Sequence, residues 1–103
     1  MKLPPGQTQE IDIPDLRETF ADSLGMTTFD GMTARITFCV QRLQPPQPPT
    51  PPQVKKYPSA RMVLTPEAAV DLFNQMQMII GAMQQAGLIK IQDGKPVATG
   101  TKH

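Results

Sequence analysis

The side chains most able to do chemistry in this sequence are one cysteine, one histidine and a few charged groups. Cys39 is a candidate nucleophile, but nucleophilic catalysis needs a base nearby, and the one histidine is the last residue, His103. An enzyme that uses Asp22, Arg35 or Cys39 is the weaker alternative, and it predicts that Cys39→Ser abolishes activity. We therefore expect no catalytic residues and interpret Cys39 as a small hydrophobic side chain of a strand.

The acidic residues and glycines also fit a structural role better than ligand binding. Glu10, Asp12 and Asp15 carry the oxygen ligands that hard cations prefer, but their spacing matches no cation-binding loop. Gly25 and Gly31 lie too far apart for a phosphate-binding loop and suit strand packing and a turn. We expect no metal and no cofactor.

Composition narrows the classes of partner. Ten basic and nine acidic residues give a net charge of +1, whereas proteins that bind the nucleic-acid backbone usually carry a clear basic excess. Residues 1–6 lack the apolar core of a secretory signal, and no apolar segment reaches the roughly 20 residues of a membrane span. The single cysteine agrees with a reducing compartment. We expect a cytoplasmic protein with neither nucleic-acid nor membrane partners.

The first structural element expected is a β-hairpin centred on Asp30-Gly31. This dipeptide favours a two-residue type I′ turn, which needs positive φ at both positions. Such a turn pairs Phe29 with Met32 and fixes the register of both strands. In that register small side chains on the first strand face three large ones on the second, which predicts a core face built on Ile36, Phe38 and Val40.

The opposite face of this hairpin is also half apolar. It carries Phe20, Leu24 and Met26 on the first strand, and it pairs Asp22 with Cys39. A one-residue slip of register would exchange the two faces, so both assignments depend on the turn.

A helix is expected in the C-terminal half. Thr65-Pro66-Glu67 is typical of a helix start, with a Thr cap, a Pro in the first turn and an acid near the positive end of the dipole. Gly87 predicts its end. A third strand, from Tyr57 to Thr65, precedes the helix. The apolar stripe of the helix comprises Ala69, Leu72, Phe73, Met76, Ile79, Ile80 and Met83.

Residues 44–53 hold six of the twelve prolines. Such a run favours polyproline II, so ten residues would reach roughly 30 Å. We predict a stiff linker, with a ligand for a proline-binding module as the alternative. The domain organisation expected is a flexible arm at 1–10, one α+β domain at 11–91 interrupted by this linker, and a flexible tail at 92–103.

The predicted fold class is α+β, with a small antiparallel sheet packed on one long C-terminal helix. The sheet has three strands, or four if Glu10–Ile13 adds one. One helix covers one sheet face, so the second face predicts a homodimer or higher homo-oligomer. Alternatively, the apolar residues of segment 11–16 fold over that face. The expected interface residues are Phe20, Leu24, Met26, Phe73, Met76, Ile80 and Met83.

Three stretches carry a family resemblance: residues 10–14, 18–22 and 60–69, the last reading Ala-Arg-Met-Val-Leu-Thr-Pro-Glu-Ala-Ala. Their order resembles the bacterial domain-of-unknown-function family numbered 3467, over roughly residues 10–85. The resemblance implies a small strand-strand-strand-helix protein and no particular activity. A looser likeness in topology links the chain to SecB-type export chaperones.

These observations predict a non-enzymatic binding or assembly protein that associates with itself, in an unspecified process. The alternative is a SecB-like chaperone that holds unfolded or partner polypeptides, which would keep apolar grooves exposed after assembly. A regulatory partner of a DNA-binding protein is a third reading. A further protein partner fits each of these.

Overall fold

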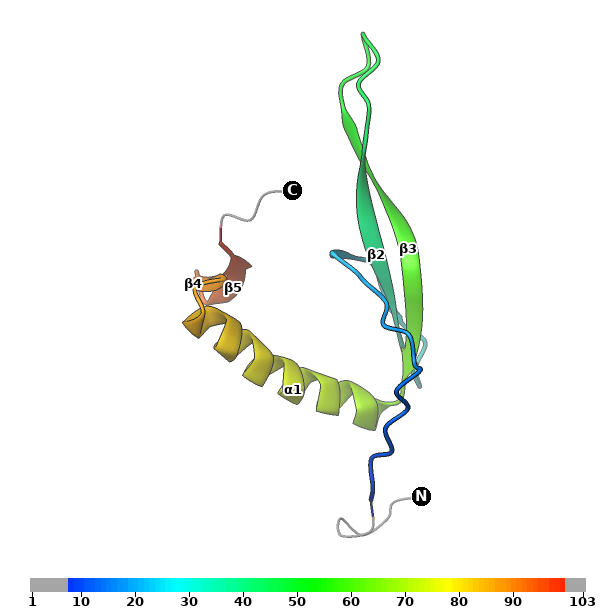
Figure 1. Ribbon diagram of the computed structural model, residues 1–103, viewed down its shortest axis with the longest axis vertical. Helices are drawn as coiled ribbons and strands as arrows, with labels where there is room; N and C mark the ends of the chain where they lie inside the picture. The colour runs from blue at the N-terminus through cyan, green and yellow to red at the C-terminus, as the bar shows by residue number, and fades with distance from the viewer. Residues whose placement is uncertain (1–7, 100–103) are drawn as a thin grey trace.

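The computed structural model describes residues 8–99 and shows a small α+β protein (Figure 1). Strands β1 (Ser23–Phe29), β2 (Ala34–Gln44) and β3 (Gln53–Leu64) form an antiparallel sheet in that order. Helix α1 (Pro66–Gln85) follows, and β4 (Ile89–Gln92) and β5 (Lys95–Ala98) form a second, two-stranded sheet. The predicted fold class is confirmed, although Glu10–Ile13 adds no strand.

The first hairpin forms at the expected place but with a longer loop. Phe29 pairs with Ala34, so the loop has four residues and the predicted pair of Phe29 with Met32 is wrong. The Asp30 carboxylate accepts hydrogen bonds from the backbone N–H groups of Met32 and Thr33, at 2.9 and 2.8 Å. Aspartate often closes a turn in this way, and here the side-chain bonds favour a wider loop over a type I′ turn.

A bulge in β1 then changes which side chains share a face. The register shifts between Leu24 and Thr27, so Leu24 pairs with Phe38, and Ser23 rather than Asp22 pairs with Cys39. Because directly paired residues lie on the same side of a sheet, Leu24 lies on the face of Phe38 and not on the opposite face. The prediction that Leu24 lies on the face opposite Phe38 is therefore wrong. The extra residue of the bulge reverses the side on which the β1 residues before it lie.

The proline-rich segment is the tip of a hairpin. Leu43 pairs with Val54 and Gln44 with Gln53, and an isolated bridge joins Gln47 to Thr50. The ends of the segment are therefore cross-strand neighbours, and the expected 30 Å linker is not formed. Pairing of the flanking strands continues to the prolines and holds the two ends together.

Helix α1 has the predicted ends. The Thr65 hydroxyl accepts a hydrogen bond from the N–H of Ala68 at 3.2 Å, and Pro66 occupies the first helical position. At the other end Gly87 has a φ of 84°, and the N–H of Leu88 donates to the Met83 carbonyl at 3.0 Å. This is a Schellman cap, for which glycine is the preferred residue. No helix within residues 8–99 combines the length and apolarity that a membrane crossing requires.

Strands β4 and β5 occupy a segment that we assigned in part to a tail. A two-residue turn, Asp93-Gly94, joins them, and both residues have positive φ, 54° and 76°. This is the Asp-Gly turn geometry that we expected at the first hairpin. Residues 100–103, including His103, lie outside the described residues.

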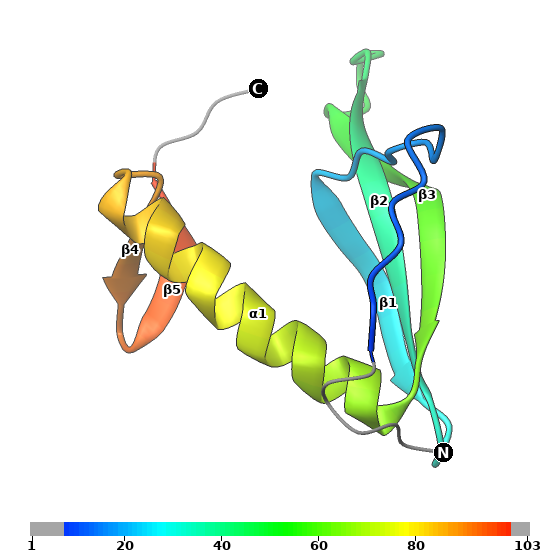
Figure 2. The same ribbon diagram turned by 60° about the horizontal axis from the view of Figure 1, so that its bottom comes forward.

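Helix α1 does not cover its own sheet. It leaves the end of β3 and runs away from the sheet, and the β4–β5 hairpin lies at its far end (Figures 1 and 2). Its main contacts are with β4 and β3, and none of its residues is buried. The predicted packing of sheet on helix is therefore not formed within one chain. Thr65 alone separates β3 from α1, so the connection between them is one residue long.

One chain by itself has almost no core. Cys39 is the one buried hydrophobic residue within 8–99, at 3% exposure. The radius of gyration is 17.9 Å, whereas a compact chain of this length has one of about 13 Å. The surface is 9422 Å², against about 5,700 Å² for a compact chain of this mass. The chain therefore has two apolar layers that do not pack on each other.

Candidate interaction surface

The three-stranded part of the sheet has one uncharged side; Arg42 and Lys55 lie on the same side only farther along, where β2 and β3 pair without β1. The pairs Ile36–Met62 and Phe38–Ala60 place their side chains on this side, and Leu24 joins them through its pairing with Phe38. A shallow apolar hollow of about 270 Å³ lies there, with Thr19 and Ala21 from the segment before β1 at its rim. We call this side the sheet face; it comprises Leu24, Thr27, Phe29, Ala34, Ile36, Phe38, Ala60, Met62 and Leu64.

The other side of the sheet is polar and closely packed around Cys39. A Cβ atom added at Gly25 would lie 2.9 Å from the Cys39 sulfur, so the thiol packs directly against the β1 backbone. On the same side, Lys56 of β3 reaches across β2 and donates from Nζ to the Leu24 carbonyl at 2.9 Å. Asp22 accepts from the N–H of Gln41 at 2.9 Å. The burial of Cys39 agrees with its interpretation as a packing residue.

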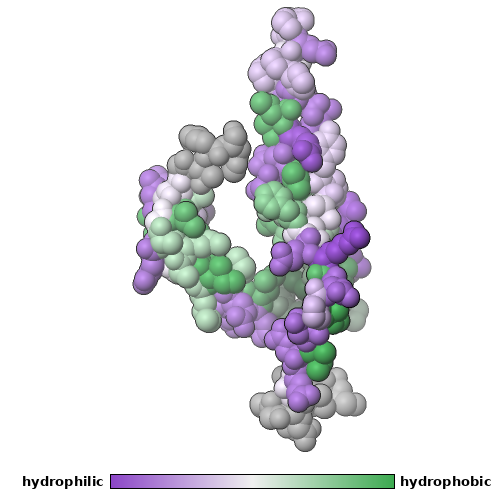
Figure 3. Space-filling view, viewed as in Figure 1, coloured by the Kyte–Doolittle hydropathy of each residue, from purple (hydrophilic) through white to green (hydrophobic). Residues whose placement is uncertain are grey.

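The second apolar surface lies on α1, which carries only two charged residues along its length, Glu67 and Asp71. The helix face comprises Leu72, Phe73, Met76, Ile79, Ile80 and Met83, most of them more than one-third exposed. In the space-filling view the helix is largely pale green to green, and open space separates it from the sheet (Figure 3).

The β4–β5 hairpin covers part of the helix face. Ile91 and Pro96 line an apolar groove of about 410 Å³ together with Phe73, Met76 and Ile80. Helical spacing and composition do not predict the contribution of Ile91 and Pro96. The Asp93-Gly94 dipeptide was the available signal, since it lies between two short segments able to pair.

The structure distributes the predicted interface residues over three places. Phe20, 70% exposed, precedes β1, and Met26, 74% exposed, lies in the bulge. Leu24 belongs to the sheet face. The four helix residues, Phe73, Met76, Ile80 and Met83, share the helix face. Within one chain the sheet and helix members do not meet.

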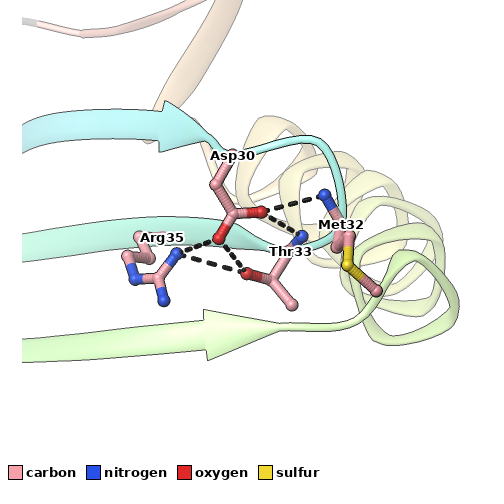
Figure 4. Close-up of polar contacts among 4 residues, drawn as sticks. All are labelled: Asp30, Met32, Thr33 and Arg35. Atoms are coloured by element: carbon pink, nitrogen blue, oxygen red, sulfur yellow. Dashed lines mark hydrogen bonds and ion pairs between the residues drawn. The ribbon is translucent and has the colours of Figure 1, made fainter.

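The strongest polar cluster is at the loop between β1 and β2 (Figure 4). The Asp30 carboxylate accepts from the backbone of Thr33 and Met32, from the Thr33 hydroxyl at 2.9 Å, and from the Arg35 guanidinium. Bonds from the Thr33 N–H, then from Arg35, hold the pKa of Asp30 well below its usual range. Each of these partners belongs to the loop or to the adjoining end of β2, so the cluster shapes the hairpin.

Residues 8–99 contain no group of three His, Cys, Asp or Glu side chains arranged to hold a metal ion. The sheet face and the helix face are the two apolar surfaces described above that a partner could cover. No family model matches the chain, and no curated protein or solved structure matches it either.

Proposed function

We propose that this chain is a non-enzymatic assembly protein that must associate with itself to complete its fold. The observation that carries the proposal is the near absence of a core: Cys39 is the one buried hydrophobic residue within 8–99 and lies on the polar side of the sheet, while both apolar layers are largely exposed. Leaving apolar surface in water costs roughly 25 cal/mol per Å², so a partner that covers these layers stabilises the folded chain.

The exposed area is more than enough for an obligate interface. The chain exposes about 3,700 Å² more than a compact chain of its mass. Obligate homodimers bury roughly 2,000–5,000 Å² in total, half of it from each subunit. A second copy can therefore cover part of the excess, up to about 2,500 Å² on each chain. The expected cytoplasmic location and the family resemblance are compatible with such an assembly and form part of the proposal.

Light scattering on a sizing column, over a dilution series, tests this proposal. We expect a mass of two or more times 11.3 kDa that persists on dilution. A mass near 11.3 kDa with the helix and sheet intact by circular dichroism would refute self-assembly.

A chaperone-like activity is the second candidate, favoured by the apolar hollow on the sheet face and the groove on the helix face. If the assembled protein held other polypeptides, these surfaces would stay accessible after association. The assembled protein would then bind an apolar fluorescent dye and suppress aggregation of an unfolded client. An assembly protein with closed interfaces would do neither.

A further inference from the structure

We propose that two copies exchange their helices, so that the helix face of each copy packs on the sheet face of the other. This inference rests on the proposed self-assembly and specifies which surfaces meet. The layer that covers each sheet face is then the helix of a second copy of this chain, and no other partner is needed.

The connection between β3 and α1 directs the helix away from its own sheet. β3 ends at Leu64 and α1 begins at Pro66, so Thr65 alone joins them. A residue before proline is restricted to extended conformations, and Thr65 has φ −70° and ψ 164°. Connections that return a helix over a sheet usually have two to six residues. The helix therefore needs a sheet from elsewhere.

The two faces match in chemistry and in length. Neither contains a charged side chain, so packing them together buries no ion. The helix face spans Leu72 to Met83, about 18 Å along the helix axis, and the sheet face spans Ala60 to Leu64, about 17 Å along β3. Helix on sheet is also the standard way to complete a two-layer α+β core.

In the exchanged dimer, one helix covers each sheet face. Within one chain the sheet face and the helix face are separated, as Figure 3 shows. A two-fold exchange covers both sheet faces with both helices at once, and such reciprocal exchange closes the assembly at two copies.

Disulfide trapping between two different single variants tests the exchange. In a Cys39→Ala background, one chain carries Met62→Cys on the sheet face, and a ¹⁵N-labelled chain carries Met76→Cys on the helix face. The two are refolded together and oxidised. Intact-mass spectrometry separates the mixed covalent dimer from the two homodimers, and we expect the mixed product to dominate.

Met78→Cys is the matched control, because Met78 is a methionine of the same helix, away from the helix face and 72% exposed. With Met62→Cys it should give at least tenfold less mixed product than Met76→Cys. A dimeric mass would leave self-assembly standing. If that dimer gave no mixed product, or gave crosslinks only between two chains that both carry Met76→Cys, the helix exchange would be overturned. A monomeric mass would overturn both.

A second variant tests the role of the connection without cysteines. Inserting six Gly and Ser residues between Leu64 and Thr65 frees the helix to fold back onto its own sheet. We expect the dimer dissociation constant to rise at least tenfold, because an intramolecular helix then competes for the sheet face. An unchanged dissociation constant would show that the short connection does not direct the exchange.

Discussion

Asp30 is the residue whose ionisation is most strongly tied to the fold. Its pKa lies below the ordinary 3.8 because the folded loop donates to its carboxylate, first from the Thr33 N–H. A lowered pKa means that the charged form is favoured in the folded state. Its contribution to stability is therefore present above pH 3.8 and is lost as the pH falls through the folded pKa. We expect carbon-13 NMR to show Asp30 titrating at lower pH in the folded protein than in urea.

Arg35→Met separates the two main causes of this shift. It removes the ion pair but leaves the N–H groups of Met32 and Thr33 in place. The pKa of Asp30 should rise only part of the way to its ordinary value, because the largest cause is the backbone bond from Thr33. Complete return to the ordinary value would contradict that order.

Gly25 of β1 lies close to the Cys39 side chain of β2. Gly25→Ala would place a Cβ 2.9 Å from the Cys39 sulfur and 3.4 Å from Thr37 Cγ2. Overpacking of this kind costs about 1–3 kcal/mol of unfolding free energy, measured by urea titration at fixed protein concentration. Adding Cys39→Ala removes the sulfur, so the double variant should be more stable than the sum of the two single effects predicts.

Gly81→Ala is the control for this pair. Apart from the adjoining residues and the helix backbone, no atom lies within 4 Å of an added Cβ at Gly81, and alanine favours helix over glycine by up to about 1 kcal/mol. It should therefore stabilise α1 where Gly25→Ala destabilises the sheet. A destabilising effect at both glycines would mean that crowding against Cys39 is not the cause.

At the scale of elements, the start of α1 depends on one side chain. The Thr65 hydroxyl accepts from the N–H of Ala68, which satisfies a donor that the helix itself leaves unpaired. Thr65→Ala should lower the free energy of unfolding by about 0.5–2 kcal/mol, read from thermal unfolding followed by circular dichroism. Thr65→Ser keeps the hydroxyl and should lose little; an equal loss in both variants would rule out the cap as the cause.

The two Asp-Gly dipeptides show how far local sequence determines an element. Asp93-Gly94 forms the two-residue turn that its composition favours, between strands that we did not predict. Asp30-Gly31 forms a four-residue loop, because Thr33 and Arg35 follow at positions from which they bond the carboxylate. The same dipeptide gives different registers because neighbouring side chains compete for the turn.

At the scale of the whole molecule, unfolding should depend on protein concentration. If folding and association are coupled, dilution favours the unfolded monomer. A tenfold dilution should lower the apparent free energy of unfolding by about 1.4 kcal/mol per mole of dimer and lower the melting temperature. Calorimetry at two concentrations measures this, and a melting temperature unaffected by dilution would contradict obligate assembly.

The features that local chemistry controls can be predicted from the residues alone. These are the α+β class, both ends of α1 from Thr65-Pro66 and Gly87, and the hairpin at Asp30-Gly31. The apolar stripe of α1 could also be read directly, since helical spacing alone defines it.

How these elements face one another could not be predicted from the sequence and depends on tertiary contacts. The bulge between Leu24 and Thr27 exchanged the sides of β1, and the paired strands around residues 44–53 turned an expected linker into a hairpin tip. A connection of one residue, Thr65, joins β3 to a helix that runs away from its own sheet (Figure 1). One extra residue in a strand or one short connection changes which side chains share a face and which layers pack together. Neither changes the spacing of apolar residues from which strands and helices are predicted.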